Sequence, residues 1–347
     1  THNDALSSDQ VSALFEDREG TIWVATSDGL DRFRELPVNS LSVKEGLSNA
    51  IATSILAARD GSIWIGTEDG LNRWNHGRTR IYRTRRDPGL PDDAIQSLFE
   101  DERGRIWVSG FRGLAAFKNG RFTAAPSVPA GLTHAIASDN HGGLWLSLWV
   151  TANDYGLAHL VDGRIVEQMS WQSVGGGPGS GLVPDPDGGI WTGLISGGIV
   201  HFRGGQIQKL PLSNHAPRAP RVRNLSRDRD GAIWAATDNG LSRITNGRVA
   251  TLTTANGLPC DAVHWIMEDD LSSYWLYTQC GLVRIARTEL DAWTSDPKRM
   301  IHPTTFDSAD GIRLPHLMRF RAFRPQVTKS SDGKIWFVNG DAASFID

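Results

Sequence analysis

The sequence lacks several features that would place a chain in a common class. Its 347 residues include only two cysteines, and no run of about 18 apolar residues occurs. We therefore expect no direct membrane insertion by this chain. The formal net charge of −3 comes from 36 Lys and Arg against 39 Asp and Glu, with the arginines scattered along the sequence. A nucleic-acid partner is not expected from such a balance.

Motifs that would indicate a cofactor, a metal or a catalytic group are also missing. No GxxxxGK[ST], CxxC, HxH or HxxxH pattern occurs in the sequence. The acidic turn residues Asp17, Asp101, Asp228 and Asp269 lack the twelve-residue ligand spacing of a calcium loop, so we expect them to cap turns. We predict no cofactor, no metal site and no catalytic residue.

Tryptophan and glycine, by contrast, are abundant and regularly spaced. Eight units each lead from a turn, usually with glycine, into a strand centred on tryptophan, as in GTIWVATSDGL and GSIWIGTEDGL. The eight core tryptophans, which number the units from first to eighth, are Trp23, Trp64, Trp107, Trp145, Trp191, Trp234, Trp275 and Trp336. Their separations are 41, 43, 38, 46, 43, 41 and 61 residues. A period near 43 is typical of a four-stranded propeller blade.

Each unit reads as a series of short strands joined by tight turns. In the first unit, residues 11–15 alternate between apolar and polar, and residues 21–26 and 30–33 form two further strands. The strand of the tryptophan is apolar or small on both faces, which favours packing between neighbouring blades. We predict an all-β fold, a single propeller over residues 1–347 with eight four-stranded blades, or alternatively seven plus a partial blade. The chain starts inside a repeat, as a trimmed chain would, and the strand that closes the ring is expected within residues 1–6.

The units resemble the repeats of the two-component regulator propeller family. The family pattern is roughly SL-ED-x-x-G-x-IW-x-GT-x-x-GL-x-RF. Residues 97–107 match its first part, as far as IW, and residues 63–74 match its second part, from IW onward. The resemblance implies a periplasmic sensor region of an inner-membrane signalling protein, often a hybrid histidine kinase, and in some members the recognition of oligosaccharides. No kinase core or membrane-proximal domain occurs within these residues, so signal output is expected of a parent protein.

Two long connections are expected at the channel mouth, where ligands of propellers commonly bind. Residues 148–155 lengthen the fourth unit, and the lead-in to the eighth unit carries His316, Arg319, Arg321 and Arg324. Aromatic faces beside amides and carboxylates suit a sugar, although Trp149 could equally pack over a blade edge. The candidate ligand-binding residues are Trp149, Asn153, Tyr155, Arg112, His134, Arg221, His264, Trp265, His316 and Arg319.

We therefore expect a sensor module that binds a small molecule or an oligosaccharide and that associates with itself, a neighbouring propeller or a membrane-proximal domain. Two alternatives remain open. One is a protein–protein docking platform. The other is an enzyme resembling the streptogramin lyases, which would need a histidine base beside a metal or carboxylate.

The two cysteines flank two strands of the seventh unit. Cys260 precedes one strand, Cys280 follows the next, and Cys260 falls about two residues from the position opposite Cys280. A disulfide is within reach, and it would support an oxidising compartment such as the periplasm. Two independent small residues in loops are the alternative.

Overall fold

The structure is a computed structural model, and it describes residues 6–18, 20–33, 37–150, 156–174, 177–212, 219–312, 323–339 and 342–346. Within these residues the fold is nearly all β, and each of the eight units forms one antiparallel sheet. The all-β propeller architecture predicted from the repeats is confirmed.

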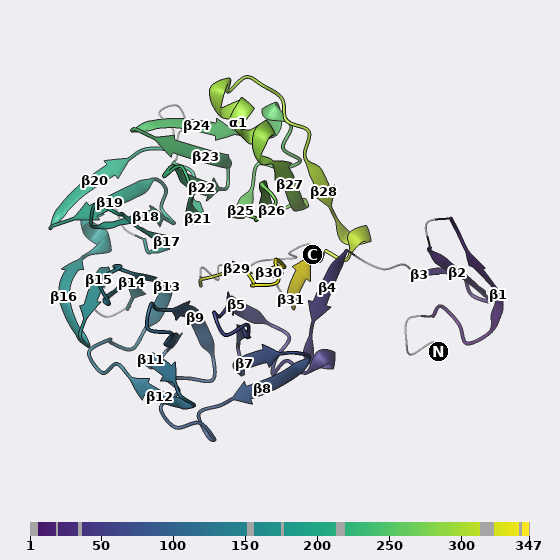
Figure 1. Ribbon diagram of the computed structural model, residues 1–347, viewed down its shortest axis with the longest axis horizontal. Helices are drawn as coiled ribbons and strands as arrows, with labels where there is room; N and C mark the ends of the chain where they lie inside the picture. Colours follow the sequence, from purple (N-terminus) through teal and green to yellow (C-terminus); the bar gives the residue numbers. More distant parts are fainter. Residues whose placement is uncertain are drawn as a thin grey trace.

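The strands of the second to eighth units occupy equivalent places around the ring (Figure 1). The first strands of the units, which are innermost in the ring, are β1 (Val11–Glu16), β5 (Ala52–Ala57), β9 (Ile95–Glu100), β13 (Leu132–Ser138), β17 (Gly179–Pro184), β21 (Val222–Arg227), β25 (Val263–Glu268) and β29 (Val327–Lys329). The second strands are β2 (Ile22–Thr26), β6 (Ile63–Thr67), β10 (Ile106–Gly110), β14 (Leu144–Trp149), β18 (Ile190–Leu194), β22 (Ile233–Thr237), β26 (Ser273–Thr278) and β30 (Ile335–Val338).

The outer half of each sheet completes the unit. The third strands are β3 (Leu30–Phe33), β7 (Gly70–Asn75), β11 (Gly113–Lys118), β15 (Leu157–Val161), β19 (Ile199–Arg203), β23 (Gly240–Thr245), β27 (Gly281–Ala286) and β31 (Ala343–Ile346). The outermost strands are β4 (Val38–Leu41), β8 (Arg78–Tyr82), β12 (Arg121–Ala124), β16 (Arg164–Met169), β20 (Gln206–Leu210), β24 (Arg248–Leu252) and β28 (Thr304–Phe306).

The repeated tryptophan lies on the second strand of every unit, and in the units of the ring it packs toward the next unit. Trp64, for example, shares a buried cluster with Leu98 and Val108 of the third unit. The acidic turn residues act as caps, as predicted, and they also hold these rings. Asp228 accepts a hydrogen bond from the indole Nε1 of Trp234 at 2.8 Å, and its other oxygen accepts the backbone N–H of Ala232 at 2.9 Å. The same indole–carboxylate bond recurs six residues apart in the first, third and seventh units.

The second to eighth units close a ring of seven four-stranded sheets. The innermost strand β29 contacts β25 on one side and β5 on the other, so the ring is continuous. The closing sheet takes its fourth strand from β4, which pairs with β31 in the register Ser344↔Ser40. Our expectation that residues 1–6 supply this strand is therefore corrected. β4 occupies the sequence position of an outer strand of the first unit, but it pairs with the eighth unit instead.

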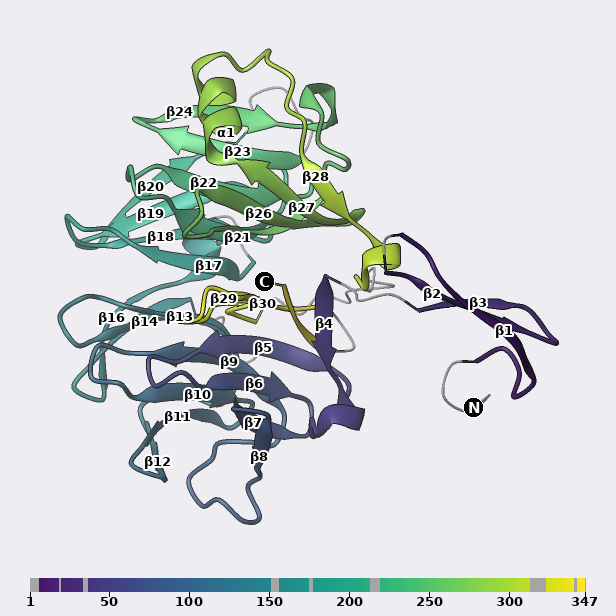
Figure 2. The ribbon, with the colours of Figure 1, turned by 45° about the vertical axis from the view of Figure 1, so that its right-hand side comes forward.

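The first unit consequently keeps only three strands, β1 to β3, and it stands apart from the ring in both views (Figures 1 and 2). The eight sheets match the eight repeats, and the ring itself has the seven-bladed arrangement of our alternative. Without neighbouring blades, this sheet exposes apolar side chains that equivalent units bury. Leu14 is 68% and Phe15 is 65% exposed, whereas the equivalent strand β5 is almost wholly buried.

The long interval between Trp275 and Trp336 contains the one α-helix of the described residues, which the sequence analysis did not anticipate. α1 (Arg287–Ser295) follows β27 and buries Leu290 and Trp293 against the core of the sixth and seventh units. Within the part of the chain that the structure describes, the single-turn 3-10 helices are η2 (Val43–Glu45), η3 (Trp171–Val174), η4 (Thr254–Asn256) and η5 (Ser308–Asp310). Among the described residues, no helix has the length and apolarity that crossing a membrane requires.

Candidate functional site

The candidate site lies at one mouth of the channel, where each innermost strand begins and each second strand ends. Trp149, the last residue of β14, presents its ring here with 41% of its surface exposed. Its backbone is held firmly. The carbonyl of Leu148 accepts a hydrogen bond from the indole of Trp171 at 2.7 Å, and the N–H of Leu148 donates to Gly156 O at 3.0 Å. An exposed ring on a fixed strand end is a suitable platform for a flat ligand.

A glycine permits this strand end to lie close to the chain that enters the same unit. Gly131 has φ +154°, and a Cβ there would lie 2.8 Å from the carbonyl oxygen of Trp149. Only glycine avoids this overlap. The following strand β13 then begins directly beneath Trp149, with Leu132 opposite it in the ladder.

His134, two residues further along β13, lies below the tryptophan and is only 5% exposed. Its ring is 6.2 Å from that of Trp149 and is stacked at 5.8 Å on Phe323. Neither ring nitrogen has a hydrogen-bond partner among the described residues. Burial, and secondly the nearby Arg324, lower the pKa of His134 to about 4, so the ring is neutral at pH 7.

The segment before β29 crosses the channel-facing edges of two innermost strands. The N–H of Leu98 donates to Arg324 O at 2.9 Å, and the N–H of Ile55 donates to Pro325 O at 2.8 Å. The N–H of Arg324 in turn donates to the hydroxyl of Ser97 at 3.0 Å. These three bonds fix Arg324 inside the channel. Our sequence analysis noted Arg324 in the long connection, but neither it nor Phe323 was singled out as a site residue.

His264 and Arg223 approach the same space from β25 and β21. His264 is buried, and its Nε2 has no hydrogen-bond partner among the described residues. Burial, and then Arg223, lower the pKa of His264 to about 4, while Asp238 acts in the opposite direction. Arg223 donates through Nε to Asp238, and Arg221 lies 3.9 Å from the same carboxylate.

The other predicted site residues have different positions. Trp265 is fully buried and packs on Tyr277 and Phe337 between the seventh and eighth units, so we correct its assignment from ligand contact to core packing. Arg112 is exposed in the turn between β10 and β11. The remaining candidates, Asn153, Tyr155, His316 and Arg319, lie outside the described residues.

The disulfide between Cys260 and Cys280 is present, with Cα atoms 5.9 Å apart. It ties the chain entering β25 to the turn after β26, beside the mouth. Cys280 lies two residues after the end of β26 and one residue before the start of β27. The cross-link therefore fixes the mouth-facing end of the seventh unit, the unit that carries His264.

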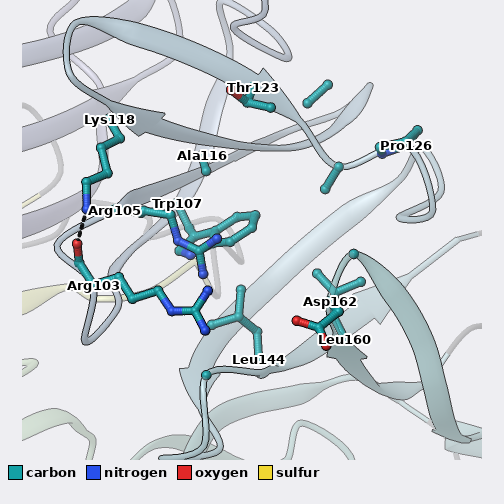
Figure 3. A pocket seen from close by; sticks show the side chains of 14 residues that line it. Arg103, Arg105, Trp107, Ala116, Lys118, Thr123, Pro126, Leu144, Leu160 and Asp162 are labelled. Atoms are coloured by element: carbon teal, nitrogen blue, oxygen red, sulfur yellow. Dashed lines mark hydrogen bonds between the residues drawn. The ribbon is translucent and has the colours of Figure 1, made fainter.

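A separate hollow of about 300 Å³ lies between the third and fourth units (Figure 3). Trp107, Leu144 and Leu160 belong both to its lining and to the buried cluster that joins these two units. Arg105 stacks 4.9 Å from the Trp107 ring and pairs with Asp101 at 2.5 Å, and Lys118 donates to the carbonyl of Arg103. Since these cations already have partners, the hollow is an interblade groove, and the mouth remains the candidate site.

The fold is that of a β-propeller, and one mouth of its channel carries the exposed Trp149 together with the buried His134, His264 and Arg324. The family model described as two component regulator propeller matches residues 5–28, 46–69 and 89–112, which fall in the first three units. The chain therefore carries repeats of this family, and the resemblance seen in the sequence is confirmed. No curated protein sequence matches the chain significantly.

Solved structures with the same fold include members of two groups. One comprises extracellular domains from Bacteroides thetaiotaomicron. BT3049, described as a hybrid two component system, is 19% identical with a TM-score of 0.77, and BT4673, described as a one component or hybrid system, is 17% identical with a TM-score of 0.64. The matches cover 99% and 98% of this chain but 46% of each of those chains, so this chain spans less than half their length.

The other group contains virginiamycin B lyase from Staphylococcus aureus, determined with quinupristin. It is 15% identical with a TM-score of 0.62, and the match covers 90% of this chain and 99% of that chain. At these identities both groups show a shared fold.

Proposed function

We propose that this propeller is the extracytoplasmic sensor module of a bacterial two-component signalling protein, located in the periplasm, and that it binds an oligosaccharide or other small molecule at the channel mouth. The observation that carries the ligand site is the proximity of exposed Trp149 to buried His134, whose ring nitrogens have no hydrogen-bond partner among the described residues. The repeats shared with the regulator family and the extracellular origin of BT3049 support the sensor role. The disulfide agrees with an oxidising compartment.

The test is a thermal-shift screen of the whole chain against neutral and acidic oligosaccharides. Ligands that bind only the folded state raise the melting temperature, and the rise grows with the logarithm of the ligand concentration relative to Kd. Trp149→Ala should abolish the shift. Leu271→Ala, which alters an even more exposed apolar side chain in the turn between β25 and β26, should retain it. A ligand whose shift survives Trp149→Ala would place the site elsewhere.

The geometry favours binding without turnover. Among the described residues, no carboxylate is hydrogen-bonded to either ring nitrogen of His134. Asp238 is the carboxylate that acts on the pKa of His264, and it already accepts a hydrogen bond from Arg223. A general base needs a partner that orients its ring and stabilises the imidazolium. Mass spectrometry of each binding sugar after prolonged incubation should therefore find it unchanged, and a released product would establish an enzyme instead.

A second proposed role is association through the first sheet, and the occupant we favour is a blade of another propeller. β1 to β3 carry the blade pattern, yet their faces lack the neighbours that cover equivalent strands in the ring. Sedimentation of this chain should show a monomer. The double substitution Leu14→Ser/Phe15→Ser should reduce the tendency of that monomer to aggregate. A stable dimer dissociated by these substitutions would identify a second copy as the occupant.

A further inference from the structure

The channel holds a buried positive charge for which the described residues supply no counter-ion. Arg324 is 8% exposed, and none of the ion pairs among these residues includes it. Its Nη1 donates to the carbonyl of Phe323 at 3.1 Å, while Nε has no hydrogen-bond partner. Burial, and then Arg223, lower the pKa of Arg324 to about 9, which still leaves the guanidinium protonated at pH 7. An uncompensated charge of this kind is costly for a folded protein.

The groups around Arg324 supply no free carboxylate among the described residues. Burial lowers the pKa of both His134 and His264, and the Arg324 charge adds to the lowering, so both rings lie within its electrostatic reach. Each has at least one buried ring nitrogen without a partner. The carboxylate that influences this space, Asp238, is already bonded to Arg223. The space around Arg324 therefore has an excess of positive charge, and each neutral histidine ring can also offer one N–H donor.

This combination selects among ligand types. A cation would be repelled, and a neutral hydroxyl would leave the guanidinium charge unbalanced. An oxyanion would both balance the charge and accept bonds from the guanidinium, because carboxylate and sulfate oxygens match the fork of an arginine. The exposed Trp149 ring lies 6.2 Å from that of His134, which in turn stacks on Phe323 next to Arg324, and it can cover the apolar face of a sugar ring.

We infer that the mouth recognises an acidic sugar, whose oxyanion binds Arg324 in the channel and whose ring lies against Trp149. The inference deepens the proposed sensor function and rests on it. A uronic-acid carboxylate and a sulfate ester share the required chemistry, and the experiment distinguishes them. The main-chain bonds of Arg324 to Ser97 and Leu98 do not involve its side chain, so the charge can be removed while these contacts remain.

Calorimetric titration of the whole chain with two matched pairs tests this inference. The pairs are digalacturonic acid with its neutral dimethyl ester, and N-acetylglucosamine 6-sulfate with N-acetylglucosamine. At least one acidic member should bind about 10- to 100-fold more tightly than its neutral partner, as a charged hydrogen bond implies. The pair that responds identifies carboxylate or sulfate. Arg324→Gln should remove the preference, and Arg121→Gln, an exposed arginine on β12, should retain it.

Inorganic sulfate provides a minimal probe that is independent of the sugar. Sulfate should raise the melting temperature saturably, beyond chloride at equal ionic strength, in the wild type and not in Arg324→Gln. If neutral sugars bind and Trp149→Ala abolishes their binding, but acids bind no more tightly, the oxyanion inference is wrong and the sensor proposal stands. An acid preference that survives Arg324→Gln also overturns the inference. If no sugar binds and sulfate gives no saturable shift, both proposals are overturned.

Discussion

At the scale of single residues, the molecule separates polar groups that complete the fold from polar groups that the fold leaves unpaired. Asp228 has three hydrogen bonds to its turn and to Trp234. His134 has none to either ring nitrogen among the described residues. Both side chains are buried. A buried polar group with a full set of partners is explained by stability, whereas one without partners points to a ligand.

Asp228→Ala should destabilise the protein by about 2–3 kcal/mol, because it leaves the buried indole N–H of Trp234 and two turn amides without their acceptor. Urea unfolding measures the loss. Asp270→Ala is the control, since this exposed carboxylate is paired with Lys329 at the surface and should change stability by less than about 1 kcal/mol. Equal effects of the two substitutions would contradict the capping role.

The buried histidines should make stability depend on pH. Their ordinary pKa of 6.5 is lowered to about 4 in the folded protein, where His134 faces Arg324, and His264 faces Arg324, Arg223 and Asp238. Between these pH values the unfolded chain binds more protons. Stability should therefore fall as the pH drops from about 6.5 to about 4, by about 3 kcal/mol for each histidine.

Urea unfolding at pH 7.5 and pH 5.0 measures this effect. The variant His134→Asn/His264→Asn cannot titrate at these positions and should lose less stability over the same interval. If the variant and the wild type lose stability equally, the two histidines are not held neutral by the fold.

At the scale of elements, the mouth is built from strand ends that are fixed by bonds outside their own ladders. Trp171 on η3 holds the end of β14, and the segment before β29 binds the free edges of β5 and β9. The disulfide does the same for the seventh unit by joining the approach to β25 with the turn after β26. Cross-links of this kind keep loop-borne binding groups in place.

Reduction of the disulfide should lower stability by about 3 kcal/mol, because Cys260 and Cys280 close a loop across 20 residues. Thermal unfolding with and without a phosphine reductant measures the change. Cys260→Ser/Cys280→Ser should melt like the reduced wild type and should not respond to the reductant. An unchanged melting temperature in reduced wild type would show that the cross-link is dispensable for stability.

At the scale of the whole molecule, closure joins segments about 300 residues apart. The hydroxyls of Ser40 and Ser344 lie 2.7 Å apart across the pairing of β4 with β31, and Val38 is buried in the core of the closing sheets. The first sheet lies outside this closure. The ring and the first unit are therefore expected to respond differently to truncation.

Removal of residues 1–36 should leave the melting temperature of the ring nearly unchanged, because β4 and all seven closed sheets remain. Removal of residues 1–42 also deletes β4. It should lower stability by at least about 2 kcal/mol, the contribution of burying Val38 alone. Differential scanning calorimetry of the two truncations compares them directly, and equal melting temperatures would contradict closure by β4.

The repeat by itself determined most of the fold. The spacing of the tryptophans predicted eight sheets, the alternation in residues 11–15 predicted a strand, and the Asp turns predicted caps. These features depend on neighbours close in sequence, so local patterns specify them. The helix α1 was missed because it is a short insertion of ordinary composition between two strands.

The tertiary structure decided what depends on contacts between distant residues. Nothing local in residues 38–41 shows that they pair with residues 343–346 rather than with their own unit. Likewise, the sequence placed His134, His264 and the connection that carries Arg324 near the mouth, but it did not show that Arg324 is buried inside the channel. Its position follows from main-chain bonds to β5 and β9, more than 200 residues earlier in the chain. Such pairings depend on the register of the closed ring, which short-range patterns do not encode.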